Sequence, residues 1–183
     1  NNTNKKDELY ESLAKIAPTV VTEGTGINWK QDFLLIAAAL GTTEKAEKLM
    51  EEYNTKAKSV GQKAGSEKTF SFLYASADRT RIFAKSSFVG SICADASLAR
   101  PAAAQVEKTS IDLSSEQLDQ ADGDYLFYGV QGGDESKLTG EALWSTLKAV
   151  TEKHAHSVDA DMFFLNAGPA AALGVLETIE KAL

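Results

Sequence analysis

The spacing of hydrophobic residues changes partway along this chain, from a helical repeat to an alternation of short apolar runs with helical patterns. In the first third of the sequence, apolar positions recur every three or four residues, as on one face of a helix. They predict helices over residues 5–16, 29–41 and 43–65. Pro18 ends the first helix, and a short strand over residues 19–22 and a flexible break at Gly24-Thr25-Gly26 precede the second. The third helix is long and is expected to lie across a globular body rather than in a coiled coil.

From residue 69 onward, apolar runs of strand length alternate with helical patterns. The expected strands cover residues 69–75, 80–84, 109–113, 124–130 and 154–158. The expected helices cover residues 87–98, 116–121, 143–150 and 169–183. This alternation is typical of a mainly parallel sheet covered on both faces. The fold class is therefore α/β, with a three-layer, mainly parallel sheet preceded by a long helix.

Composition narrows the class of protein. The 43% of hydrophobic and 25% of charged residues are ordinary for a soluble protein. The net charge of −7 argues against nucleic-acid binding, which needs clustered Lys and Arg. No apolar run approaches the roughly 20 residues of a membrane span. The chain begins with the polar Asn1-Asn2-Thr3-Asn4 and shows no signal peptide, which favours a trimmed or internal start.

The sequence offers little for catalysis or metal binding. Cys93 is the single cysteine, which excludes an internal disulfide, and its place in an apolar helical row predicts a core residue. His154 and His156 share one face of an expected strand, but two ligands are too few for a tight metal site. Motifs of serine hydrolases, phosphate loops and dinucleotide folds are absent from the sequence. We therefore expect a protein that is not an enzyme and needs no cofactor.

Positive charge gathers around one strand and the helix after it. The group consists of Arg79, Arg81, Lys85 and Arg100. Ser86 and Ser87 can cap the following helix, whose free N–H groups beside Arg81 and Lys85 would suit an anion. Ligands of open α/β sheets bind beyond the carboxyl ends of strands. From the residues alone, an anion site and ordinary surface solvation weigh equally.

Aromatic and amide side chains also fall near expected strand ends, where they could line a cleft. They are Tyr128, Gln131, Trp144, Phe163, Phe164 and Asn166. Each aromatic residue taken alone is expected more often in a core than in a cleft.

Two linked patterns carry a family resemblance. They are Arg81-x-Phe83-x-x-x-Ser87-Phe88-x-Gly90-x-x-x-x-Asp95-x-x-x-x-Arg100-Pro101 and Ser114-x-Glu116-Gln117-Leu118-x-x-Ala121-Asp122-x-Asp124. Together they resemble the C-terminal lobe of iron–siderophore substrate-binding proteins of ABC importers, and the order of the remaining segments is similar across nearly the whole chain. The resemblance implies a C-terminal lobe fragment. Residues 1–26 would be the end of a missing N-terminal lobe, residues 27–66 the linking helices with a stiff interlobe helix, and residues 67–183 the C-terminal α/β lobe.

The resemblance also implies a function. The protein would bind a ferric siderophore outside the cytoplasmic membrane and deliver it to an ABC permease, with a signal peptide and a lipid anchor lying outside this chain. The ligand-binding residues would be Arg79, Arg81, Lys85, Ser86, Ser87, Phe88, Tyr128, Gln131, Phe163 and Asn166. Some members of the family have an arginine at the position that aligns with Ser87. Because this chain has a serine there, the charge would come from Arg79, Arg81 or Lys85. Glu116 would dock on the permease.

Alternatives remain open on the sequence alone. Haem or cobalamin could be the ligand in the same fold, and an α/β interaction domain without a small ligand is a further option. Metal-cluster oxidoreductase subunits share the two-lobed architecture, but they need several cysteines and this chain has only Cys93.

Overall fold

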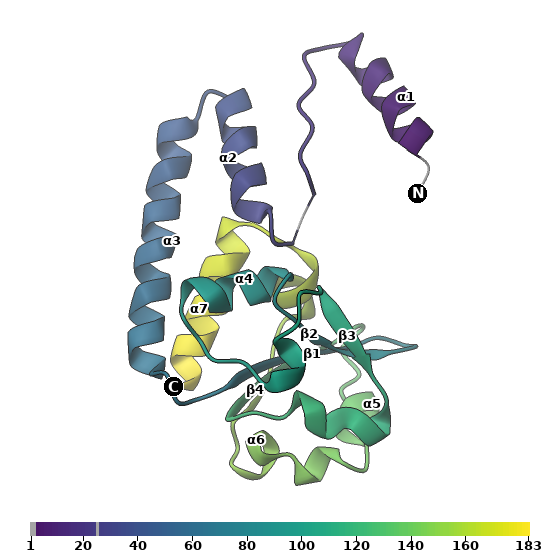
Figure 1. Ribbon diagram of the computed structural model, residues 1–183, viewed down its shortest axis with the longest axis vertical. Coiled ribbons are helices and arrows are strands. Elements are labelled where there is room, and N and C mark those ends of the chain that lie inside the picture. The colour runs from purple at the N-terminus through teal and green to yellow at the C-terminus, as the bar shows by residue number, and fades with distance from the viewer. Residues whose placement is uncertain (1–2, 25) are drawn as a thin grey trace.

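The structure is a computed structural model that describes residues 3–24 and 26–183. Asn1 and Asn2 of the polar start and Thr25 of the expected flexible break lie outside the described residues. The first part of the chain forms α1 (Thr3–Ala14), α2 (Trp29–Ala39) and the long α3 (Thr43–Ala64), as the helical pattern predicts (Figure 1). The strand expected over residues 19–22 is wrong, because in the described part of the chain this segment pairs with no other strand.

The second part forms one five-stranded sheet in the order β3-β2-β1-β4-β5. The strands are β1 (Phe70–Ala75), β2 (Thr80–Phe83), β3 (Ser110–Leu113), β4 (Tyr125–Val130) and β5 (Ala155–Ser157). The pairs β1–β4 and β4–β5 are parallel, whereas β2 is antiparallel to both β1 and β3. Only β2 therefore runs against the other strands of this sheet, and the expected mainly parallel sheet is confirmed.

Helices cover both faces of this sheet, so the three expected layers are present (Figure 1). One face, here called the α4/α7 face, is covered by α3, α4 (Phe88–Asp95), the π-helix η4 (Asp161–Leu165) and α7 (Pro169–Ala182). The opposite α5/α6 face is covered by η1 (Ala102–Ala104), η2 (Ser115–Ala121), α5 (Ser136–Thr139), η3 (Trp144–Thr146) and α6 (Lys148–Thr151). Side chains that alternate along each strand supply the two cores.

Two expected helices differ from the structure in extent. The helix expected over residues 87–98 ends at Asp95, and the chain then turns at Ser97, whose φ is 54°. The helix expected over residues 143–150 is split into η3 and α6, because Leu147 between them has extended backbone angles. Apolar spacing alone does not reveal such breaks, since both short pieces still bury their apolar side chains against the sheet.

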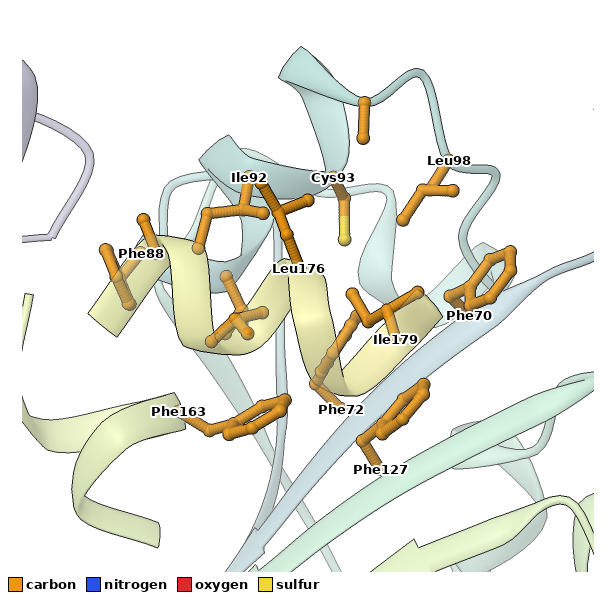
Figure 2. Packing of buried hydrophobic residues seen from close by; sticks show 14 of the residues in the cluster. Phe70, Phe72, Phe88, Ile92, Cys93, Leu98, Phe127, Phe163, Leu176 and Ile179 are labelled. Carbon is orange, nitrogen blue, oxygen red and sulfur yellow. The ribbon is translucent and has the colours of Figure 1, made fainter. Parts of the chain in front are cut away.

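The larger core lies on the α4/α7 face (Figure 2). Phe72 and Phe127 stack across neighbouring strands, with ring centroids 5.4 Å apart. Above them, α4 contributes Ile92 and Cys93, and α7 contributes Leu176 and Ile179 (Figure 2). Cys93 is only 2% exposed, which confirms its expected place in the core. Each fully buried large side chain stabilises the fold by about 1.5–3 kcal/mol.

A polar junction joins α2 and α3 to α4. Asp95 at the end of α4 accepts hydrogen bonds from Lys30 Nζ of α2 at 2.6 and 2.7 Å and from the Tyr53 hydroxyl of α3 at 2.5 Å. Nearby, Trp29 Nε1 donates to Ser91 Oγ at 3.0 Å. Burial, and then the bond to Asp95, raise the pKa of Tyr53. Its hydroxyl therefore stays protonated and keeps donating, and α2, α3 and α4 are held as one unit.

Asp124, just before β4, supports a prediction on the pH dependence of stability. Its carboxylate accepts from Lys148 Nζ at 2.6 Å, from Thr69 N at 2.7 Å and from Thr69 Oγ1 at 2.9 Å. Lys148 first, and then Thr69, lower the pKa of Asp124 from 3.8 to about 2. The carboxylate thus stabilises the folded state above its unfolded pKa, and this stabilisation is lost as pH falls from about 5 to about 2.

Asp124→Asn is therefore expected to lower the free energy of unfolding at pH 7. The loss should be only about 1 kcal/mol, because the Lys148 side chain is half exposed and solvent screens its ion pair with Asp124. At pH 2 the variant and the wild type should be nearly equal. Urea unfolding measured at several pH values tests this. A difference that stays constant down to pH 2 would contradict the linkage.

Candidate ligand-binding site

A group of aromatic rings lies on the α4/α7 face towards the carboxyl end of β1. Tyr74 of β1, Phe83 of β2 and Phe164 of η4 have ring centroids 4.9–6.3 Å apart. Their exposed fractions are 5–8%, whereas Phe72, Phe127 and Phe163 deeper in the same core are fully buried. We call Tyr74, Phe83 and Phe164 the aromatic platform. The platform is the slightly exposed edge of this core.

Arg81 borders this platform. It pairs with Tyr74 across β1 and β2, and its guanidinium carbon lies 5.9 Å from the Tyr74 ring centroid. The side chain is 23% exposed, and its buried Nε has no hydrogen-bond partner in the described part of the chain. The nearest carboxylate contact is Asp112 Oδ1 at 3.9 Å from Nε, which is too long for a hydrogen bond. A half-buried arginine with an unused donor beside aromatic rings can bind an anion with an apolar body.

The sequence makes room for Phe164 at one point of β4. Gly129 faces η4, and a Cβ atom at this position would lie 2.9 Å from Phe164 Cε2 and 3.1 Å from Ala160 Cβ. Only a residue without a side chain lets η4 pack this closely over the carboxyl end of β4. Gly129 therefore sets the height of Phe164 above the sheet.

The basic residues of the expected anion site do not come together. Arg79 precedes β2 and Lys85 follows it, so the two lie at opposite ends of this strand. Because β2 is antiparallel to β1, Arg79 lies at the carboxyl end of β1 and Lys85 lies towards its amino end. Arg79 lines a polar cavity of about 380 Å³ with Lys137 at the carboxyl end of β1. Lys85 pairs with Glu107 at 3.2 Å. Of the three expected charge donors, Arg81 is the one that borders the platform.

The segment from Ser86 to Phe88 shapes the site mainly through buried side chains. Ser87 caps α4, since its Oγ accepts from Gly90 N at 2.9 Å, and it is fully buried. Phe88 packs edge-on against Trp29 with centroids 5.6 Å apart. Ser86 is half-buried in the same loop.

The remaining expected site residues divide between the two faces of the sheet. Tyr128 packs on the α5/α6 face against Trp144 and donates to Glu135 Oε2 at 3.1 Å. Burial, and then Glu135, raise the pKa of Tyr128. Gln131 and Asn166 are exposed, Gln131 after the carboxyl end of β4 and Asn166 after η4, whereas Phe163 is fully buried beneath the platform.

Sequence reasoning did not single out Tyr74 and Phe83, and for the site it chose Phe163 over its neighbour Phe164. The alternation of Arg81 and Phe83 along a strand was a usable signal, because residues two apart share a face. For the consecutive aromatics, only the π-helical geometry of η4 decides that Phe164 joins the platform.

The two histidines stack on aromatic rings of β4. His154 lies 4.7 Å from Tyr125 and His156 lies 5.4 Å from Phe127, measured between centroids. Within residues 3–24 and 26–183, no group of three or more His, Cys, Asp or Glu side chains is placed to hold a metal ion. None of the helices in the described part of the chain is both long and apolar enough to cross a bilayer.

The structure thus combines a three-layer α/β sheet, a long helix on one side and an aromatic platform bordered by Arg81. The chain belongs to the periplasmic binding protein family, whose model matches residues 1–162. It is 30% identical over 197 residues to the "Probable siderophore-binding lipoprotein YfiY" of Bacillus subtilis, covering 98% of this chain and 60% of that protein. The iron(3+)-hydroxamate-binding protein FhuD of the same organism is 29% identical, with 94% and 58% covered. The chain thus spans about three fifths of the length of these curated relatives.

Solved structures share the fold. SirA of Staphylococcus aureus superposes with a TM-score of 0.82 at 26% identity, covering 97% of this chain and 72% of that one. SirA complexed with staphyloferrin B gives a TM-score of 0.81 at 25% identity, with 96% and 67% covered.

Proposed function

We propose that this chain is part of an extracytoplasmic solute-binding protein that captures a ferric siderophore and delivers it to an ABC importer. Arg81 beside the aromatic platform is the observation that carries the proposal. A ferric siderophore is bulky and often anionic, so a cationic fork beside aromatic faces offers both charge and apolar contact. The relatives named as siderophore-binding and hydroxamate-binding proteins support the same ligand class.

In this proposal the ligand lies between two lobes. Residues 67–183 form the lobe that carries the platform, residues 27–66 link the lobes, and residues 1–26 belong to the second lobe. The bonds that join α2 and α3 to Asp95 of α4 support a stiff link, because they leave little freedom between the linking helices and this lobe. The protein would act without catalysis or a resident cofactor. Its contact with a membrane would be through a lipid anchor.

The ligand class can be tested by tryptophan fluorescence of the full-length protein. Ferric catecholates, ferric hydroxamates, ferric carboxylates, haem and cobalamin are titrated in parallel. We expect saturable quenching by at least one ferric siderophore and no saturation by haem or cobalamin. Quenching by haem or cobalamin alone would show that one of these, and not a siderophore, is the ligand. The absence of quenching by every compound in the panel would favour an interaction domain without a small ligand.

Glu116 is the proposed permease contact. It is exposed in the first turn of η2, where a negative charge also suits the helix N-terminus. Glu116→Arg in the full-length protein is expected to lower siderophore uptake by cells about tenfold, because charge reversal in a small contact costs at least 1.4 kcal/mol. The siderophore affinity of the purified variant should be unchanged. Glu51→Arg, at an exposed position of α3, is the matched control. Equal uptake by the two variants would rule out the docking role.

A further inference from the structure

A second arginine lies near the other end of β2, buried beneath α4. Arg100 is 8% exposed, donates from Nε to the Phe70 carbonyl at 2.7 Å and donates from Nη2 to the Phe83 carbonyl at 2.6 Å. Its guanidinium carbon lies 4.9 Å from the Phe72 ring centroid. These contacts fix the plane of the guanidinium group and leave one edge unused.

Arg100 also lines a cavity. Its Nη1 is buried and has no hydrogen-bond partner among the described residues. Arg100 lines a cavity of about 310 Å³ together with Lys85, Gln105 and Glu107 and the apolar side chains of Ile27 and Leu98, as well as Gly90, Cys93 and Ala94 of α4. Lys85 pairs with Glu107 across 3.2 Å, but both side chains are about half exposed or more and can move apart. The space is sufficient for an ion of four or five heavy atoms and its water.

Glu107 lines the same cavity but pairs with Lys85, and no ion pair to Arg100 is found among the described residues. The carboxylate of α4, Asp95, is taken by Lys30 and Tyr53. The Cys93 thiol lines the same cavity, but burial raises its pKa against the smaller opposing effect of Arg100. The thiol therefore stays neutral. A buried guanidinium without an ionic partner is unfavourable, and a small anion would remove that penalty.

We propose that this cavity binds a small oxyanion of the phosphate or carboxylate type, held by Arg100 Nη1 from inside and by Lys85 from the rim. The site is separate from the aromatic platform and does not depend on the siderophore. Arg100 also donates a hydrogen bond to the carbonyl of Phe83, a platform residue at the end of β2. The bound anion would therefore stabilise this end of β2.

Thermal unfolding of the chain, without siderophore, tests the site. Inorganic phosphate and acetate are titrated separately at constant ionic strength, with sodium chloride as the balancing salt. We expect at least one of the two oxyanions to raise the Tm by about 3 °C at saturation over chloride alone. A response to phosphate or to acetate then identifies which type of oxyanion the cavity takes.

The variants separate this site from general salt effects. Lys85→Gln removes the positive charge at the rim and should raise the dissociation constant of the oxyanion about tenfold. Lys181→Gln, at an exposed position of α7, should leave this constant unchanged. Arg100→Lys keeps the charge but not the fork, and should abolish the response if it folds. Independently of that variant, the Arg100 Nε–H resonance of the wild type should shift with the oxyanion. Equal Tm shifts in chloride, or equal responses of the two lysine variants, would overturn the proposal.

Discussion

Replacing Arg81 by glutamine in the full-length protein is expected to weaken its affinity for an anionic ferric siderophore about 10- to 100-fold. The guanidinium group borders the aromatic platform with its buried Nε unpaired, so a ligand that reaches it forms charge-assisted hydrogen bonds without first breaking a strong ion pair. Such bonds contribute about 1.5–3 kcal/mol each, which corresponds to this range of affinity. Arg81→Lys should fall between, because the charge remains but the planar fork is lost.

Tryptophan fluorescence titration with the most strongly quenching siderophore of the panel measures the change. Lys181→Gln removes the same charge far from the platform and should leave the affinity unaltered. Thermal unfolding of each variant checks that the protein is still folded, which we expect because Arg81 is held in the sheet by backbone pairing with Tyr74 and Asp112, and this pairing does not involve its side chain. An affinity loss below about threefold for Arg81→Gln would show that the ligand does not reach this arginine.

Secondary-structure elements that depend on a short stretch of sequence were predicted correctly. The apolar run of β4, the long amphipathic α3 and the short helix expected over residues 116–121 each depend on a few neighbouring positions, and all three are found. The segment over residues 19–22 has the composition of a strand but no partner in the described chain, and composition cannot supply a partner. Pairing is a property of distant segments.

The arrangement of the candidate site likewise depends on contacts between segments that are far apart in the sequence. Arg79, Arg81 and Lys85 were expected as ligand-binding residues because they are close together in the sequence, but the extended strand β2 separates Arg79 from Lys85. Tyr74 and Phe164 are far apart in the sequence and meet only because η4 packs over Gly129. Arg81 could be named from its residue type and position and Phe83 from the alternation along the strand, but Tyr74 and Phe164 could not.

The crossing of α3 and α4 gives the largest expected effect on stability. Gly61 of α3 lies against the end of α4, and a Cβ atom at this position would be 2.0 Å from the carbonyl oxygen of Ala96 and 3.0 Å from its carbonyl carbon. Carbon–oxygen contacts between packed backbones are about 3.3 Å or longer. The obstructing atoms belong to the backbone, so no side chain can rotate to relieve the clash and the two helices must move apart.

Gly61→Ala therefore places two effects in opposition. Alanine is favoured over glycine in a helix interior by about 0.8–1 kcal/mol, whereas overpacking of this kind costs about 1–3 kcal/mol and occasionally more. Because the contact would be more than an ångström too short, we expect the clash to prevail, with a net loss of about 2 kcal/mol and a Tm about 4–8 °C lower. Gln62→Ala, at the next and exposed position of α3, changes helix propensity without a clash and should stay within about 0.5 kcal/mol of the wild type. A stabilised Gly61→Ala variant would mean that α3 and α4 are not in close backbone contact, and the attachment of α3 to α4 would then rest on the Asp95 junction alone.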